Sequence, residues 1–295
     1  MPGRRGPSGL PMNVENRRLV AGVSSFDTRP QLIRWAVDET AARGAELRLV
    51  TAVPQRAASE RYLPSDAADE LRRDAHDTLA QAAKYAEQHR PGLWITTEVV
   101  GGRPADVLLA AATHADLLVV GADDQSPFTE AIIGSVPGTL LTTAPCPLVV
   151  VPHSDLNIRA DMPVVVALDE SGTSQAAMAY AFATADRTRR PLRVLHCVLD
   201  GHDDGSILPG LARALTGFGA LYPRVDAAHD VVAGDPRDVL TQRSRTSALL
   251  VLGSRGHGRL ASGLFGSVGR TLIRRSGCPV VIARPRSAEL TRGMS

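Results

Sequence analysis

Short, continuous apolar runs alternate along the chain with longer stretches whose apolar residues have helical spacing. In the first half, the apolar runs predict strands at Leu19–Val23, Leu47–Val53, Trp94–Val100, Leu117–Val120 and Leu148–Val151. The stretches between them predict helices at Arg29–Arg43, Asp66–His89, Pro104–Thr113 and Ser135–Thr143. Because continuous apolar strands separated by helices must be buried on both faces, this pattern predicts an α/β fold with a mostly parallel sheet.

The second half of the chain repeats the first half in the same order. RLVAGVSS at Arg18–Ser25 corresponds to PVVVALDE at Pro163–Glu170, and VVGGRPADVL at Val99–Leu108 corresponds to VVAGDPRDVL at Val231–Leu240. We therefore interpret the chain as a tandem duplication of a unit of about 140 residues. The expected division is a disordered tail at 1–16, a first domain at 17–152, a linker at 153–162, a second domain at 163–286 and a tail at 287–295.

A glycine-rich stretch in the second half is the main candidate for binding chemistry. Gly253–Val268, written GSRGHGRLASGLFGSV, follows the apolar run Ala248–Leu252 and precedes a segment with helical spacing. Ser267 stands where an N-cap residue is preferred. A strand, a glycine loop and a helix start present free backbone N–H groups and a positive helix dipole, which favour a bound phosphate.

The spacing Gly253-x2-Gly256-x9-Gly266-Ser267 resembles the nucleotide-binding signature of the universal stress protein family. Asp169 at the end of a strand, the turn Gly234–Pro236 and the Gly-Cys-Pro-Val-Val run at 277–281 support the resemblance, which covers nearly all of the chain after the first residues. It implies two tandem, doubly wound, Rossmann-like domains, each with a parallel five-stranded sheet in the order 3-2-1-4-5. It also implies that the last strands, Leu148–Val151 and Val280–Ala283, pair to form an internal pseudo-dimer, and it leaves a further homodimer open.

The resemblance further implies that the chain binds an adenine nucleotide, namely ATP, with or without Mg²⁺. The base would lie near the ends of the first two strands of the second half, at Ala167, Asp169 and Cys197. The ribose and phosphates would follow the glycine loop, at Gly253, Ser254, Arg255, Gly256, His257, Gly258 and Arg259. The loop would close on the phosphates at Gly266, Ser267 and Val268.

The first half keeps the frame of this site but departs from its chemistry. Ser24 stands at the position of Asp169, and Asp124 stands at the position of Gly256. The loop Gly121–Val136 carries acidic residues and no basic one, whereas Gly253–Val268 carries basic residues and no acidic one. A polyphosphate prefers the second loop on charge alone. We therefore predict one competent site, in the second domain, and a weak or empty one at the corresponding residues Gly22, Gly121, Gly134, Ser135 and Val136.

Structural interpretations of the same residues stay open beside the functional ones. The glycine loop could be a tight turn, and Asp169 could cap the following helix. Cys197 is expected to be a small buried apolar residue rather than a reactive thiol. His257 and Arg259 could be solvated loop charges. The run GHGRLA at Gly256–Ala261 resembles a dinucleotide fingerprint, but it follows the fourth strand rather than the first and is discounted.

Composition narrows the class of protein. The 295 residues are 44% hydrophobic and 22% charged, which is typical of a soluble globular protein. The formal net charge of +2 gives no strong sign of a nucleic-acid or membrane partner, and we expect neither. The odd cysteine count, at Cys146, Cys197 and Cys278, does not suggest a disulfide framework, so we expect a cytoplasmic protein. No apolar run approaches the roughly 18 residues of a membrane helix, and no signal-type apolar region follows the N-terminal basic residues.

The motif content favours binding over catalysis. The sequence has no GxxxxGK[ST], GxSxG or HExxH motif, and the second glycine loop has no carboxylate to hold Mg²⁺, so no metal site and no fast ATPase are expected. The leading hypothesis is a non-catalytic, ATP-dependent stress-response regulator. A slow ATPase or self-phosphorylating enzyme, with Ser267 or a nearby hydroxyl as acceptor, and a scaffold without nucleotide remain the alternatives.

Overall fold

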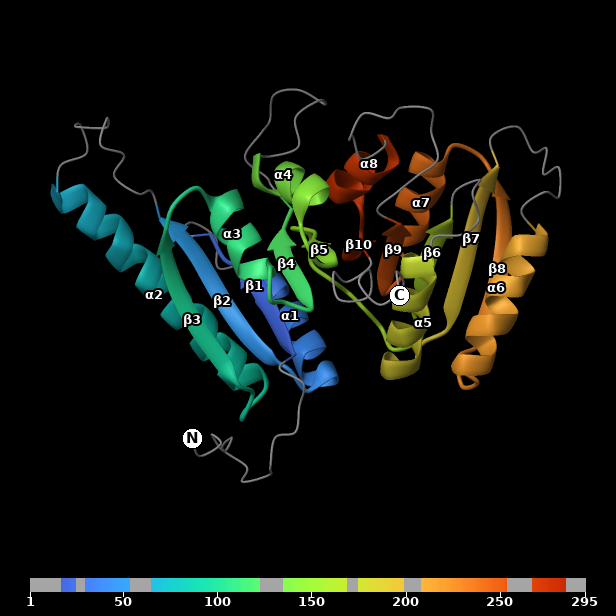
Figure 1. Cartoon of the computed structure of the whole chain (residues 1–295), viewed down its shortest axis with the longest axis horizontal. Helices are drawn as coiled ribbons and strands as arrows, with labels where there is room; N and C mark the ends of the chain where they lie inside the picture. Colours follow the sequence, from blue (N-terminus) through green and yellow to red (C-terminus); the bar gives the residue numbers. More distant parts are fainter. Residues whose placement is uncertain are drawn as a thin grey trace, which may run out of the picture. The chain divides into compact units, whose positions relative to one another are not determined.

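The computed structural model describes residues 17–24, 30–53, 65–122, 135–168, 175–198, 208–253 and 267–284. Strands and helices alternate through these residues, as the apolar pattern predicts (Figure 1). The chain divides into two compact units, Met1–Val120 and Gly121–Ser295. None of the helices in the described ranges is long and apolar enough to cross a membrane.

The first unit is built on parallel strands in the order β3-β2-β1-β4. These strands are β1 (Arg18–Gly22), β2 (Glu46–Val53), β3 (Ile95–Gly101) and β4 (Leu117–Gly121). Helices α1 (Pro30–Arg43) and α2 (Ser65–His89) pack on strands of this sheet, and α3 (Pro104–Ala112) packs on β1 and β2. Leu19 in the central β1 is fully buried and pairs in register with both Leu47 and Leu117. A central strand buried on both faces explains why its sequence is a continuous apolar run.

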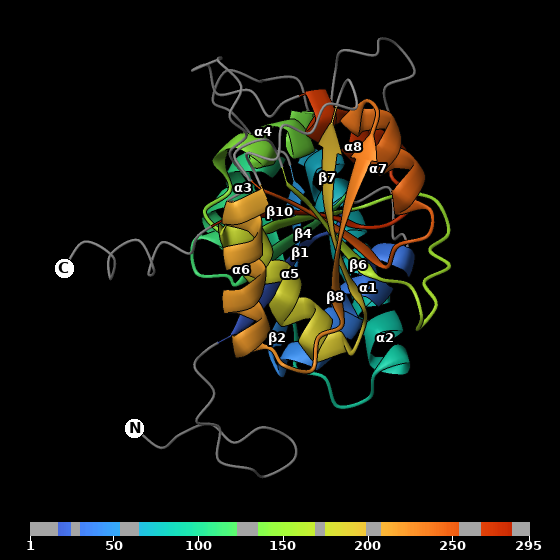
Figure 2. The same cartoon turned by 90° about the vertical axis from the view of Figure 1, so that its right-hand side faces the viewer.

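The second unit contains a sheet in the order β5-β10-β9-β6-β7-β8. Its strands are β5 (Leu148–Val151), β6 (Val164–Leu168), β7 (Leu192–Val198), β8 (Ala227–Ala233), β9 (Leu249–Gly253) and β10 (Val280–Ala283). Figure 2 shows α5 (Gln175–Thr188) and α6 (Leu208–Leu221) on one face of the sheet, with α7 (Pro236–Ser244) and α8 (Ser267–Arg275) on the other. Helix α4 (Ser135–Thr143) packs against β5.

The strand order confirms one part of the prediction and corrects another. The second repeat has the order β8-β7-β6-β9-β10, which is the predicted 3-2-1-4-5. The predicted pairing of the last strands is also confirmed, because β10 is antiparallel to β5, with Val280 opposite Val150. The predicted number of five strands per sheet is too low for the second unit, since this same pairing lets β5 continue the sheet beyond β10. Both β5 and β10 are buried along their whole length, so neither could remain an open edge without exposing apolar residues and unpaired backbone groups.

The boundaries of the predicted elements agree with the structure to within a residue or two. Helix α4 and strand β5 have the predicted limits, while β1 begins and ends one residue earlier than expected. Helix α1 ends where predicted, and the following Gly44 has a φ of 59°, the left-handed conformation that favours glycine after a helix. Ser267, predicted to precede its helix as the N-cap, is instead the first residue of α8.

Arg284, the residue after β10, caps the C-terminal end of α4. Its Nη1 atom donates to the carbonyl oxygens of Ala144 (2.9 Å) and Thr142 (3.4 Å), and its Nη2 atom donates to that of Leu141. Helix C-terminal carbonyls have no partner within the helix, so the guanidinium supplies hydrogen bonds that the last turn otherwise lacks. Burial lowers the pKa of Arg284 from its usual range, as expected for a charge drawn out of water.

We expect the substitution Arg284→Leu to lower the free energy of unfolding by about 2 kcal/mol, because it leaves partly buried carbonyls without donors. Urea denaturation followed by circular dichroism measures the loss. Arg284→Lys, which keeps the charge but not the fork of donors, should give a smaller loss. Arg224→Leu removes an exposed arginine as a matched control and should change stability by no more than about 0.5 kcal/mol. Equal unfolding midpoints for Arg284→Leu and the wild type would contradict the capping role.

Candidate functional site

The carboxyl ends of three parallel strands of the second unit bring candidate residues to one edge of the sheet. Ala167 in β6 is in register with Leu195 in β7 and with Leu252 in β9. Gly253 directly follows Leu252, and Cys197 lies two residues after Leu195. Ala167, Cys197 and Gly253 are each half-buried. Ligands of doubly wound α/β proteins bind at this edge, so the structure places these three sequence candidates where a ligand is expected.

The N-terminal end of α8 forms another part of the same region. The helix begins with Ser267, which is exposed, followed by the half-buried Val268, while Leu272 and Ile273 are buried beneath it. Thr271 Oγ1 donates a hydrogen bond to the Ser267 carbonyl oxygen at 2.9 Å. The first N–H groups of a helix have no acceptor within it and stand at the positive end of its dipole. This end of α8 is therefore suited to an anion.

Several candidates of the second repeat lie outside the described residues. They are Asp169 and the loop residues Ser254, Arg255, Gly256, His257, Gly258, Arg259 and Gly266. The structure does describe the two ends of that loop, Gly253 at the end of β9 and Ser267 at the start of α8. The end of β9 and the start of α8 thus both lie in the stretch for which the sequence predicts phosphate binding.

An aspartate and an arginine at the start of α7 belong to this region and were not among the sequence candidates. Asp235 is the N-cap of α7, and its Oδ1 accepts a hydrogen bond from the Arg237 backbone N–H at 2.8 Å. The same carboxylate binds the Arg237 side chain, with Nε at 3.0 Å from Oδ1 and Nη2 at 2.5 Å from Oδ2. The signal in the sequence was the run Asp-Pro-Arg, in which Asp and then Pro mark a helix start.

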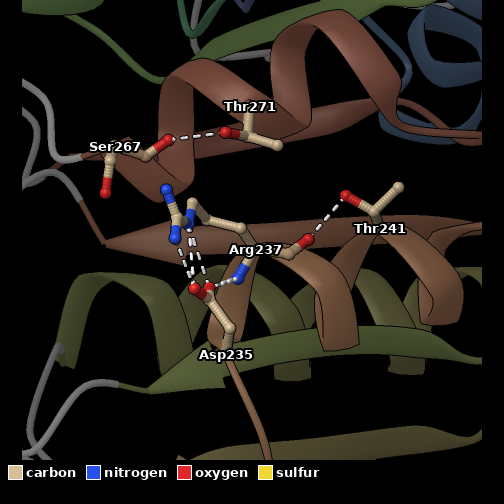
Figure 3. Close-up of polar contacts among 5 residues, drawn as sticks. All are labelled: Asp235, Arg237, Thr241, Ser267 and Thr271. Atoms are coloured by element: carbon tan, nitrogen blue, oxygen red, sulfur yellow. Dashed lines mark hydrogen bonds and ion pairs between the residues drawn. The ribbon is translucent and has the colours of Figure 1, made fainter.

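The geometry of this turn depends on glycine and on charge. Gly234 has a φ of 136°, a backbone conformation that residues other than glycine rarely adopt. The side-chain hydrogen bond from Arg237 is the main cause that lowers the pKa of Asp235 to about 2, assisted by the backbone hydrogen bond. Figure 3 shows the Arg237 side chain reaching from α7 toward the first turn of α8, where Ser267 and Thr271 lie. Helices α7 and α8 pack against each other.

Cys197 is held as a neutral thiol at this edge. Burial is the main cause that raises its pKa to about 11, the Asp235 charge raises it further, and Arg243 partly opposes the shift. A thiol is nucleophilic only as the thiolate. The structure therefore favours the interpretation of Cys197 as a small apolar wall residue over that of a reactive cysteine.

The corresponding edge of the first repeat has different chemistry. Gly22 ends β1, and a Cβ atom placed there would lie 2.9 Å from Leu108 Cδ1, so a larger residue would make the Leu108 side chain on α3 shift. Ser24, at the position of Asp169, is exposed. Before α3, Arg103 occupies the N-cap position without a side-chain capping hydrogen bond, and Ala105 stands at the position of Arg237.

The remaining candidates of the first repeat are only partly described. Gly121 ends β4, and Ser135 and Val136 begin α4, whereas Gly134 and Asp124 lie outside the described residues. Across the described part of the chain, no group of three His, Cys, Asp or Glu side chains gathers as a set of metal ligands.

Comparisons with known proteins agree on one family. A family model described as "Universal stress protein family" matches residues 15–152 and 162–284. A universal stress protein of Mycobacterium tuberculosis is 32% identical over 286 residues, covering 90% of this chain and 96% of the relative. A second, from Mycolicibacterium smegmatis, is 29% identical over 288 residues, covering 91% and 97%.

A solved structure that covers nearly the whole chain shows the same fold. The crystal structure of a universal stress protein from Archaeoglobus fulgidus covers 92% of this chain and 97% of its own, with a TM-score of 0.73 at 20% identity. A solved universal stress protein in complex with cAMP aligns with 47% of this chain at 25% identity and a TM-score of 0.38.

We expect native Cys197 to resist iodoacetamide at neutral pH and to react appreciably only as the pH approaches 11, because its thiolate is disfavoured by burial. Since the folded-state pKa lies above the unfolded value of about 8.5, the thiol contributes stability below pH 8.5 and loses it as the pH rises toward 11. Peptide mapping of the alkylated protein across this range measures the profile, and the buried Cys146 and Cys278 serve as internal controls. Rapid labelling of Cys197 at pH 7 would contradict the neutral thiol.

Proposed function

The chain belongs to the universal stress protein family, and we propose that it is a non-catalytic stress-response regulator that binds ATP in its second repeat. The observation that carries the proposal is the convergence of Ala167, Cys197 and Gly253 with the start of α8 at one edge of the sheet. This edge collects the elements that a nucleotide needs: an uncharged wall for the base and a helix N-terminus for the phosphates.

The described residues fit the two ends of an adenine nucleotide. The neutral thiol of Cys197 and the methyl group of Ala167 present no charge to a base. The exposed Ser267 adds a hydroxyl beside the free N–H groups of the first turn of α8. In the proposed complex, Asp169 and the loop 254–266 complete the site, with the glycines allowing the backbone to approach the phosphates.

We further propose that the two repeats, with the limits 17–152 and 163–286, differ in competence. Asp124 replaces Gly256, and a carboxylate at about 4 Å from a phosphate charge costs roughly 1 kcal/mol in water and more where the site is partly buried. Gly22 stands where the second repeat has Ala167, and a Cβ atom there would press on Leu108, so packing offers a reason for this glycine that involves no nucleotide. The first repeat then serves the architecture, and the second serves binding.

One observation favours a second candidate function. The Ser267 side chain is exposed at the first turn of α8, where the terminal phosphate of ATP would lie. Transfer of the γ-phosphoryl group to Ser267 Oγ, with release of ADP and of the hydroxyl proton, would make the protein a slow self-phosphorylating enzyme rather than a passive binder.

Calorimetric titration of the full chain with ATP should give one site per chain. Gly256→Asp, which introduces the carboxylate of the first loop into the second, should weaken ATP binding by about tenfold or more through like-charge repulsion. The matched control is Gly256→Asn, which adds a side chain of the same size without the charge and should weaken binding less. Two equivalent ATP sites per chain would rule out the asymmetric proposal.

Mass spectrometry of small molecules released by denaturing the purified protein should detect intact ATP. Recovery of ADP together with a phosphate on Ser267 in the wild type, and its loss in Ser267→Ala, would favour the self-phosphorylating enzyme. A protein that carries no nucleotide and binds none in titration would instead be a scaffold.

A further inference from the structure

The ion pair between Asp235 and Arg237 is accessible to solvent and can rearrange at low cost. The Arg237 side chain is 49% exposed and the Asp235 side chain 30% exposed. Ion pairs at such positions contribute little to stability, because water competes for both partners. Asp235 therefore orients the Arg237 guanidinium, but a stronger anionic partner can replace it.

The position of the Arg237 side chain points to an anion. The guanidinium extends from the first turn of α7 toward the first turn of α8 (Figure 3), on the side where Ser267 begins that helix. Two sources of positive potential, the arginine and the α8 dipole, thus face the same region. Asp235 forms hydrogen bonds with the arginine, and the charge of the nearby Asp238 also acts on it.

Comparison of the two repeats separates this arginine from the common architecture. Both repeats have the turn Gly-x-Pro before the helix, at Gly102 and at Gly234. In the first repeat, however, the position of Arg237 is Ala105, and Arg103 replaces the aspartate. The fold of this turn therefore does not require Arg237. The repeat that keeps the glycine signature is the one that carries it.

We propose that Arg237 is a specificity-determining residue that leaves Asp235 to bind the β- and γ-phosphates of the nucleotide, so that the site distinguishes ATP and ADP from AMP and adenosine. This inference rests on the proposed nucleotide site in the second repeat. A polyphosphate offers a guanidinium more negative charge and more acceptor oxygens than one carboxylate does, and the planar fork of arginine matches both. Asp235 competes with the nucleotide for Arg237, so the strength of this ion pair sets how much affinity the phosphates must supply to draw the arginine away.

The test is the dependence of affinity on the number of phosphates, measured by titrating the full-length protein with ATP, ADP, AMP and adenosine. Arg237→Gln should weaken ATP and ADP binding by roughly tenfold and leave adenosine binding unchanged. Asp235→Asn keeps an oxygen to cap α7 but removes the competing charge, so it should strengthen ATP binding by about threefold without affecting adenosine.

The matched control is Arg224→Gln. Arg224 forms a similar exposed pair with Asp186, with Nη2 at 3.2 Å from Oδ1, and lies just before β8, away from the carboxyl ends of the strands. Its substitution should change no affinity. Thermal melting of each variant by circular dichroism verifies that the fold is intact.

The outcomes separate the two proposals. If the wild type binds ATP and Arg237→Gln weakens all four ligands equally, or weakens none, the role of Arg237 is wrong while the nucleotide site stands. If the wild type binds none of the four ligands, the proposed function fails, and the role of Arg237 fails with it.

Discussion

Two-sided burial of the central strands β6 and β9 is the constraint on which the candidate site depends. Val165 and Val166 in β6 and Leu250 and Val251 in β9 are all buried, so both faces of each strand are covered. A shift of register by one residue would exchange the two faces of a strand and misplace every side chain in the packed layers. The register that pairs Ala167 with Leu252 is therefore fixed by packing, and it aligns the ends of both strands. Candidate residues just beyond the two strand ends are therefore held side by side.

The same packing frame supports different chemistry in the two repeats. Both repeats bury equivalent strands, and both open a loop and a helix at the carboxyl end of the fourth strand. The differences lie beyond the strand ends, where Ala105 replaces Arg237 and Asp124 replaces Gly256. Substitutions of this kind cost little folding energy, because they leave the buried strands unchanged. A duplicated chain can thus lose binding in one copy and keep that copy as structure.

The sequence was sufficient for the elements and for the edge that holds the candidate site. Continuous apolar runs indicated the strands, and the strand order followed from the family resemblance. The pairing of β10 with β5 also followed from the family resemblance rather than from the apolar pattern. Periodicity shows that Val280 and Val150 are buried, but not that their pairing extends one sheet beyond five strands. Arg237 was missed because its position near α8 depends on how the turn folds, and an arginine at the start of a helix is not in itself a sign of a binding site. The cap at Asp235 brings a side chain two positions later back onto the same carboxylate.

The Asp235 carboxylate both caps α7 and binds the Arg237 side chain, and this determines what could displace that side chain. Oδ1 accepts from the Arg237 backbone N–H as well as from its side chain, so the cap of α7 persists when the guanidinium leaves. With a pKa of about 2, Asp235 is ionised at physiological pH. Loss of the arginine would let this pKa rise toward the ordinary carboxyl value of about 3.9, which is still far below neutrality. Protonation is therefore excluded as the trigger between pH 6 and 8. A competing anion remains as the proposed trigger, and an anion with several charges at the first turn of α8 would compete most strongly.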